Sequence, residues 1–304
     1  MYIFGDIGNS ETKIFLVNSK KEILKKINFS SKFINDSILS KKFKLIVKNF
    51  EKIEKILFCS VVPKNFTLIK KFLSKKTKIR CYEIKELNLK SFIEIKARYK
   101  QVGSDRLANA ISLLNNKDNF IILDFGTATT FDVLINRTYR GGVIAPGINI
   151  SLNTLSNSAS LIPKINLKKI KSVIGIDTNT AVRSGFFWGY AGLIDNIINL
   201  IKKETRKSYK VIITGGFSSL FKKSIKTKVI GNNTITAVRS GFFWGYAGLI
   251  DNIINLIKKE TGKSFKVIIT GGFSNLFKNS IKTKASQNQD ITINGLIKIS
   301  KLII

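Results

Sequence analysis

Two short polar loops, each directly after an apolar run, constrain the fold of this 304-residue chain most strongly. The first, Asp6-Ile7-Gly8-Asn9-Ser10, follows residues 2–4, and the second, residues 124–130, follows residues 120–123. Each loop leads into another β-rich run, at 14–17 or 131–135, so each pattern predicts a β-hairpin. The glycines let the backbone approach a ligand closely, and the small hydroxyl and amide groups suit a phosphate. Two such hairpins predict two related halves that grip one nucleotide.

The polar residues of this chain suit phosphoryl transfer to an alcohol. That reaction needs a cradle for the polyphosphate, a divalent metal and a carboxylate that accepts the hydroxyl proton. The first hairpin offers Lys13 as a point charge for a phosphate and Asp6 as a carboxylate for hydrated Mg²⁺. Asp105 is the best candidate for the base, because Arg106 beside it can bind an anionic substrate and Gly103 leaves room for one.

Six motifs occur in order along the chain. They are Asp6-x-Gly8-Asn9-Ser10-x-x-Lys13, Ser60-Val61-Val62-Pro63, Gly103-x-Asp105-Arg106, Asp124-Phe125-Gly126-Thr127-Ala128-Thr129, the glycine-rich run 141–147, and Thr214-Gly215-Gly216. Alone, an Asp-x-Gly after a strand is usually a turn, and an Asp-Arg pair is usually a surface ion pair. As an ordered set, the motifs resemble the type III pantothenate kinases of bacteria over essentially the whole chain.

The resemblance implies an α/β fold of the actin-like ATPase superfamily. Two ribonuclease H-like domains, residues 1–116 and 117–304, would hold ATP in the cleft between them. The implied reaction is ATP-dependent phosphorylation of pantothenate to 4'-phosphopantothenate, the first step of coenzyme A biosynthesis. A homodimer with pantothenate near the interface is implied as well.

The resemblance also implies roles for individual residues. Asp105 would accept the proton, and pantothenate would lie among Gly103, Ser104, Asp105 and Arg106. Asp124 would bind a monovalent cation, K⁺ or NH₄⁺, and Asp6 would hold Mg²⁺ through water. The residues expected around ATP are Asp6, Ile7, Gly8, Asn9, Ser10, Glu11, Thr12, Lys13, Thr127, Gly215 and Gly216.

One aromatic contact departs from the family pattern. The family usually has a Tyr two residues before an Asn-Pro pair, whereas this chain has Lys96-Ala97-Arg98-Tyr99. Two alternatives stay open for Tyr99: it contacts the substrate from a shifted position, or it is an ordinary strand residue.

A tandem duplication is the largest departure from the family. Residues 173–228 recur as residues 229–284, an offset of 229 − 173 = 56, with seven differences and 56 − 7 = 49 identities. Each copy predicts a helix (182–204 or 238–260), a strand (210–213 or 266–269) and a Thr-Gly-Gly turn. Two copies are too few for a solenoid, which needs at least about three repeats, so an inserted duplicate is favoured.

One active site can use only one copy of this unit. Gly231-Asn232-Asn233-Thr234 is closer to the family's Gly-Lys-Asn-Thr, but the first copy leaves the ribosome earlier and can dock first. We favour Thr178 with Thr214-Gly215-Gly216, and Thr234 stays the alternative. The unused copy has an apolar helix face, so it packs on the outside, pairs with another subunit or lowers solubility.

Composition narrows the chemistry and the compartment. The chain has no histidine, so a carboxylate must act as base, and Cys59 and Cys81 are too far apart for a CxxC motif. The start of the chain lacks the layout of a signal peptide, and polar residues interrupt the apolar stretch 185–201, so a cytoplasmic protein without membrane spans is expected.

The formal charge of +33 does not by itself indicate a nucleic-acid partner. The lysines are scattered along the chain together with abundant Ile and Asn, which AT-rich coding explains without selection for binding. Two alternatives to the active kinase remain: a Bvg accessory factor-like transcriptional regulator, and a kinase that the duplication has inactivated.

Overall fold

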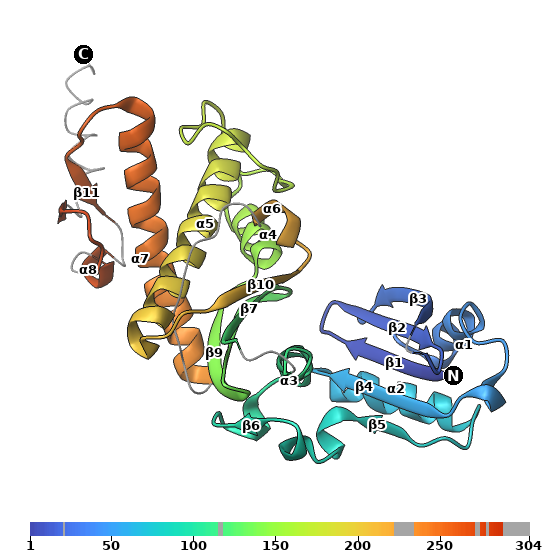
Figure 1. Cartoon of the computed structure of the whole chain (residues 1–304). Coiled ribbons are helices and arrows are strands. Elements are labelled where there is room, and N and C mark those ends of the chain that lie inside the picture. The colour runs from blue at the N-terminus through green and yellow to red at the C-terminus, as the bar shows by residue number, and fades with distance from the viewer. Residues whose placement is uncertain (21, 115–117, 222–233, 271–273, 278–279, 288–304) are drawn as a thin grey trace. The chain divides into compact units, whose positions relative to one another are not determined.

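The computed structural model describes residues 1–20, 22–114, 118–221, 234–270, 274–277 and 280–287 (Figure 1). The chain forms two compact units. The first comprises residues 1–120 with 132–141, and the second comprises residues 121–131 and those from 142 onward. Residues 231–233, which were compared with the family's Gly-Lys-Asn-Thr sequence, lie outside the described residues.

A mixed five-stranded sheet forms the centre of the first unit. Its order is β3-β2-β1-β4-β5, with β1 antiparallel to β2, β2 antiparallel to β3, and parallel pairing of β1 with β4 and β4 with β5. The strands are β1 (Tyr2–Ile7), β2 (Glu11–Val17), β3 (Ile23–Ser30), β4 (Lys55–Ser60) and β5 (Cys81–Glu83). The first predicted hairpin, β1 with β2, is therefore confirmed.

Buried and partly exposed residues alternate along β1, and this alternation explains how the sheet packs. Ile3 and Ile7 point into a core with Phe43 of α1 (Asp36–Lys44) and Phe72 of α2 (Pro63–Ser74). Gly5 lies against the ring of Phe58, since a Cβ there would lie 2.0 Å from a ring carbon. The chain then passes through short 3₁₀ turns and β6 (Glu94–Ile95) to α3 (Ser104–Ile111). The turns are Phe50–Lys52, Ile84–Glu86, Leu89–Ser91 and Tyr99–Gln101.

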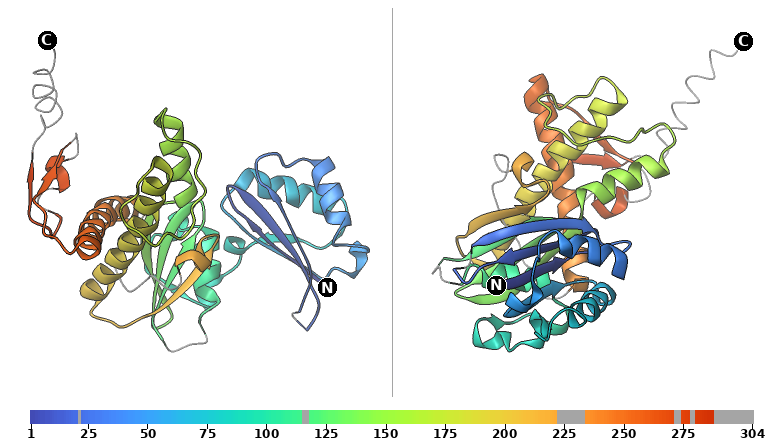
Figure 2. Two further views of the ribbon diagram at one scale, coloured as in Figure 1. Left: turned by 90° about the horizontal axis from the view of Figure 1, so that it is seen from above. Right: turned by 90° about the vertical axis from the view of Figure 1, so that its right-hand side faces the viewer.

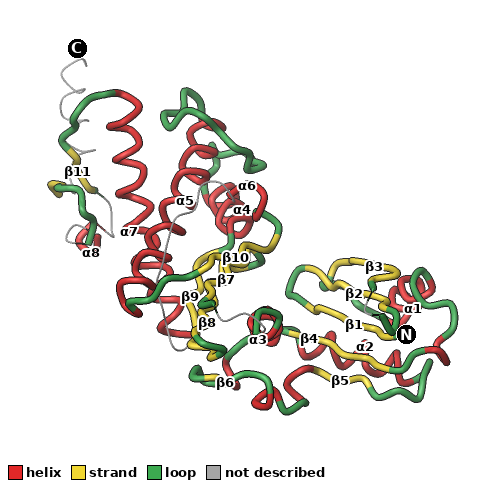
Figure 3. Tube along the Cα trace, in the orientation of Figure 1, coloured by secondary structure: helices red, strands yellow, loops and turns green. Residues whose placement is uncertain are grey.

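The second sheet repeats the neighbour order of the first. Its order is β10-β7-β8-β9-β6, so β9-β8-β7-β10 corresponds to β3-β2-β1-β4. Figure 3 shows the strands in yellow. The strands are β7 (Phe120–Phe125), β8 (Ala128–Ile135), β9 (Thr138–Pro146) and β10 (Lys210–Gly215). Helix α4 (Ile148–Ser158) follows β9 along the chain. The expected α/β fold with two ribonuclease H-like halves is confirmed, with parts of β8 and β9 grouped with the first unit.

The first copy of the duplicated segment contributes α5 (Thr178–Thr205), β10 and α6 (Ser218–Phe221). Helix α5 begins four residues before the predicted start, because Asp177 forms a capping box with Thr180: Thr180 N donates to Asp177 Oδ1 at 2.8 Å. The helix ends at Thr205, and its C-cap residue Arg206 adopts a left-handed conformation with φ 52°.

The second copy contributes α7 (Thr234–Thr261), β11 (Val267–Ile269) and α8 (Ser274–Phe277). Strand β10 joins the five-stranded sheet, whereas among the described strands β11 pairs only with β12 (Ala285–Gln287). Helix α7 packs along α5 (Figures 1 and 2). The second copy therefore lies outside the sheet, which is the first of the three outcomes considered for it.

No helix in the described ranges combines the length and apolar character that a membrane span requires.

Candidate functional site

The first hairpin places two opposite charges across from each other. The turn closes through Gly8 N, which donates to Glu11 O at 3.0 Å, and Asp6 pairs in register with Lys13. Lys13 Nζ lies 3.8 Å from Asp6 Oδ2, and both side chains are 39% exposed. An exposed pair at this distance is held only weakly, so both groups can turn to a charged ligand.

Not every side chain of this hairpin can reach a ligand. Ile7 is fully buried in the core, and the buried Thr12 hydroxyl lies 2.8 Å from Ser31 Oγ. Any contact of Ile7 or Thr12 with ATP would come from the backbone, which is how phosphate cradles commonly work.

Asp6 has a partly desolvated carboxyl group. Burial raises its pKa, the Lys13 ammonium opposes this, and the nearby Asp105 carboxylate adds to the rise. The Cys59 thiol lies 3.6 Å from Asp6 Oδ1, and burial raises the pKa of that thiol, so it remains a neutral donor. Asp105 is therefore within electrostatic reach of Asp6, inside one compact unit.

Asp105 is fixed at the start of α3. Its Oδ1 accepts a hydrogen bond from Arg106 N at 2.8 Å, in the first turn, where a carboxylate is favourable. A Cβ on Gly103 would lie 2.4 Å from the same Oδ1. The glycine predicted to leave room for a substrate therefore also leaves room for the Asp105 carboxylate.

Arg106 lies in a buried charge network. Arg106 Nε donates to Asp132 Oδ1 at 2.7 Å, and the Tyr139 hydroxyl donates to the same oxygen at 2.6 Å. Arg106 is 9% exposed, and Asp132 and Tyr139 are fully buried. Burial raises the pKa of Tyr139 well above its ordinary value, so its hydroxyl stays a donor. In the described part of the chain, Arg106 Nη2 and Asp132 Oδ2 are buried without a hydrogen-bond partner.

The sequence interpretation missed Asp132 and Tyr139. The available signal was the charged residue inside the apolar strand sequence Phe131-Asp132-Val133-Leu134-Ile135, because a buried aspartate requires a partner.

Breaking this network should reduce stability in proportion to the charge left unpaired. We expect Asp132→Asn to lower the free energy of unfolding by about 3 to 5 kcal/mol, because it leaves the Arg106 guanidinium buried without a counter-charge. Tyr139→Phe removes one donor and keeps the ion pair, so a loss of about 1 kcal/mol is expected. Urea unfolding of both variants checks this, and equal losses would contradict it.

The second hairpin and the Thr-Gly-Gly turn meet in the second unit. Gly216 N donates to Phe125 O at 3.0 Å. Gly215 has φ +86°, and a Cβ there would lie 2.6 Å from Asp124 Oδ1. The structure thus brings Asp124 and the Thr-Gly-Gly turn of the first copy together.

Gly147, at the start of α4, touches the loop of the second hairpin. A Cβ at this position would lie 1.9 Å from the carbonyl oxygen of Thr127 and 2.6 Å from its carbonyl carbon. The loop that carries Thr127 is therefore positioned by direct backbone packing.

A methyl group at Gly147 should displace this loop. We expect Gly147→Ala to lower the free energy of unfolding by about 1 to 3 kcal/mol through overpacking against backbone that cannot turn aside. Gly126→Ala is the control in the same loop, since its Cβ would have its nearest contact at an ordinary 3.6 Å. Thermal unfolding compares the two, and a Gly147→Ala protein as stable as the control would refute the close approach.

The other residues predicted to contact the substrate lie on separate elements. Thr178 and Thr234 are the first residues of α5 and α7. Tyr99 lies in the 3₁₀ turn Tyr99–Gln101, with Lys85 Nζ 5.5 Å from its ring centroid, so the alternative of an ordinary strand residue is wrong.

Comparisons with known proteins converge on one family. A family model described as type III pantothenate kinase matches residues 2–200. A curated type III pantothenate kinase from Pelagibacter ubique (strain HTCC1062) is 65% identical over 236 residues, which cover 78% of this chain and 95% of the relative. One from Jannaschia sp. (strain CCS1) is 48% identical over 122 residues, 40% of this chain and 47% of the relative.

Solved structures show more distant likenesses. A putative Baf family transcriptional activator from Campylobacter jejuni has 18% identity and a TM-score of 0.37, covering 99% of this chain and 98% of that one. A putative N-acetylmannosamine kinase from Listeria monocytogenes has 14% identity and a TM-score of 0.40, covering 84% of this chain and 98% of that one.

Proposed function

The chain belongs to the type III pantothenate kinases, which phosphorylate pantothenate in coenzyme A biosynthesis, and we propose how its own residues divide that reaction. The observation that carries the proposal is the placement of Asp105 within electrostatic reach of the Asp6–Lys13 hairpin. A proton acceptor and a phosphate cradle are thereby held in one compact unit. The domain boundary near residue 116, with ATP between the two halves, is part of the same proposal.

Asp105 is the proposed base. The primary hydroxyl oxygen of pantothenate bonds to the γ-phosphorus of ATP, the bond from that phosphorus to ADP breaks, and the hydroxyl proton passes to the Asp105 carboxylate. The hydrogen bond from Arg106 N holds one carboxylate oxygen and leaves the other for the substrate.

Arg106 is proposed to bind the carboxylate of pantothenate. Asp132 holds its Nε, and the buried Nη2 has no acceptor in the described part of the chain. A substrate carboxylate would complete the donor set only after displacing the atoms that cover Nη2. Gly103 and Ser104 would line the same site, with Tyr99 as the aromatic contact and Thr178 or Thr234 as the threonine contact.

The hairpin residues 6–13 are proposed to hold the phosphates of ATP, with Thr127, Gly215 and Gly216 contributing from the second unit. Among the described residues, no three His, Cys, Asp or Glu side chains gather as a metal site. A single carboxylate such as Asp6 fits a Mg²⁺ ion whose other ligands are phosphate oxygens and water. When bound, the ion would offset the negative charge of the phosphates. Asp124, whose Oδ1 faces the Thr-Gly-Gly turn, offers hard oxygen to K⁺ or NH₄⁺.

The proposal extends to compartment and assembly. We expect a cytoplasmic enzyme that forms a homodimer with pantothenate near the interface, as the family resemblance implies. Nucleic acid is not an expected partner.

Replacing the base tests the chemical step. We expect Asp105→Asn to reduce turnover about 10²-fold or more, because the amide keeps the shape of the side chain but cannot accept the proton. ATP affinity should change little. The assay couples ADP release to added pantothenate, and full turnover in the variant would assign the base elsewhere.

The same assay on the unmodified chain separates the alternatives. Pantothenate-dependent ADP release is expected from the kinase, whereas an inactivated kinase or a Bvg accessory factor-like regulator would show none. Family membership favours the kinase.

Exchanging the cation tests Asp124. We expect activity in K⁺ or NH₄⁺ buffer and much lower activity in Na⁺ alone, because the larger ions suit a different spacing of oxygen ligands. Asp124→Asn should remove that difference. Equal rates of the unmodified enzyme in K⁺ and Na⁺ would rule out this role.

A further inference from the structure

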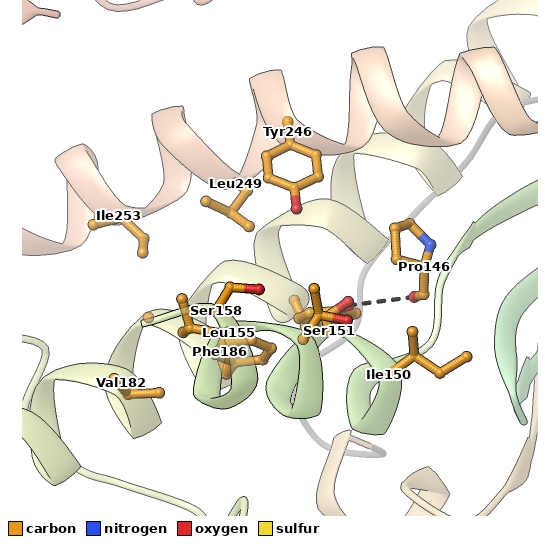
Figure 4. A pocket seen from close by; sticks show the side chains of 13 residues that line it. Pro146, Ile150, Ser151, Leu155, Ser158, Val182, Phe186, Tyr246, Leu249 and Ile253 are labelled. Carbon is orange, nitrogen blue, oxygen red and sulfur yellow. Dashed lines mark hydrogen bonds between the residues drawn. The ribbon is translucent and has the colours of Figure 1, made fainter. Parts of the chain in front are cut away.

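Helices α4, α5 and α7 surround a cavity of about 650 Å³ in the second unit (Figure 4). In Figure 4, Tyr246 and Leu249 of α7 lie on one side of it, opposite Ser151 and Leu155 of α4. A volume of this size is typical of sites for small molecules. The apolar side chains that line the cavity are Ile150, Leu155, Val182, Phe186, Leu249 and Ile253.

The lining of this cavity carries no charge. Among the described residues, 13 line it, and none of them is Asp, Glu, Lys or Arg. In the whole chain 23% of the residues are charged, so this stretch of surface differs sharply from the rest. An ionised ligand would lose its hydration here without gaining a counter-charge. ATP and pantothenate, the substrates of the proposed reaction, are both anions, so neither suits the cavity.

The open space begins where α5 and α7 move apart. A Cβ on Gly189 of α5 would lie 2.9 Å from Leu249 Cγ, so the helices are in close contact there. A Cβ on Gly185, one turn earlier, would meet nothing within 4 Å, and Gly185 lines the cavity. The space beside Gly185 is therefore large enough to hold added atoms, whether they belong to a ligand or to a larger side chain.

Neutral hydroxyl groups mark one end of the cavity. The Tyr190 hydroxyl donates to Pro146 O at 3.3 Å, and Ser151 Oγ lies 2.9 Å from the Tyr190 hydroxyl oxygen. Because Tyr190 uses its one proton on Pro146, Ser151 is the donor to Tyr190, and Ser151 Oγ keeps its lone pairs as an acceptor. Burial raises the pKa of Tyr190 to about 12, so this end stays uncharged at neutral pH.

We propose that this cavity binds an uncharged, mainly apolar small molecule that carries one neutral hydrogen-bond donor, such as an alcohol, at the Ser151 end. The apolar body of the molecule lies between Phe186 and Leu249 and removes their side chains from water. The cavity lies in the second unit and shares no residue with the Asp6–Lys13 hairpin, so its occupant is independent of the proposed kinase reaction.

An uncharged fluorescent probe tests the class of ligand. N-phenyl-1-naphthylamine has an apolar aromatic body and one N–H donor, and its emission rises in apolar surroundings. We expect the full chain to bind it saturably at one site. We expect 1-decanol to displace it at least about tenfold better than decanoate, an anion of the same chain length. No saturable binding, or equal displacement by the two competitors, would overturn the proposal.

Two matched substitutions on α5 locate the bound probe. Gly185→Leu places a side chain in the open space, so it should raise the Kd of the probe at least about tenfold. Ala181→Leu is the control one turn earlier, since Ala181 is exposed and does not line the cavity. Equal Kd values for the two variants would place the probe elsewhere.

A substitution on α4 keeps the test decisive if Gly185→Leu fails to fold. Ser151→Ala removes the acceptor and leaves the apolar walls intact, so the Kd of 1-decanol should rise about fivefold. Ser156→Ala is the control on the same helix, because Ser156 Oγ donates to Pro163 O and does not line the cavity. Circular dichroism checks that both variants are folded. An unchanged Kd in folded Ser151→Ala protein would overturn the assignment of the donor end.

Discussion

The buried ion pair between Arg106 and Asp132 connects the parts of the first unit that matter for function. It ties α3, which carries Asp105, to the β8–β9 hairpin, and Tyr139 adds a second donor to the same oxygen. A charge buried this deeply is costly unless it is paired, so the position of α3 is strongly determined. Residues 132–141 group with the first unit, to which they are joined both by this pair and by the pairing of β9 with β6.

Close backbone contact at glycine organises both units. Gly5 fits against Phe58 in the first sheet, and Gly147 and Gly215 fit against the loop after β7 in the second. None of these positions has room for a Cβ. Gly147 and Gly215 lie against backbone atoms of the loop after β7, whereas Gly5 lies against the Phe58 ring. Phosphoryl transfer requires such fixed geometry, because catalysis depends mainly on positioning charged groups.

The sequence predicted the features that depend on local pattern. The hairpin β1–β2 follows from two apolar runs joined by an Asp-x-Gly turn, whereas the pairing of Asp6 with Lys13 was not predicted and comes from the strand register. The start of α5 was predicted too late, because the capping box formed by Asp177 and Thr180 was not recognised. Asp132 could not be assigned, because its partner Arg106 lies 26 residues away and only the fold brings them together.

The placement of the two copies also lay beyond sequence reasoning. With 49 of 56 residues identical, nothing local distinguishes the strand that joins the sheet from the strand that does not. The structure resolves this by sheet pairing: β10 lies beside β7, and β11 pairs with β12.

Helices α5 and α7 pack on each other reciprocally, because Gly192 lies against Asn252 and the equivalent Gly248 lies against Asn196. This packing changes how the surface can vary. In a symmetric pair of identical chains every substitution appears twice, so a change that helps one side of the contact is forced on the other. Here Gly192 and Gly248 are encoded separately, and each faces its asparagine once. One helix can therefore change while the other is kept, and the existing difference between Asn179 and Ile235 shows that the two are already no longer identical.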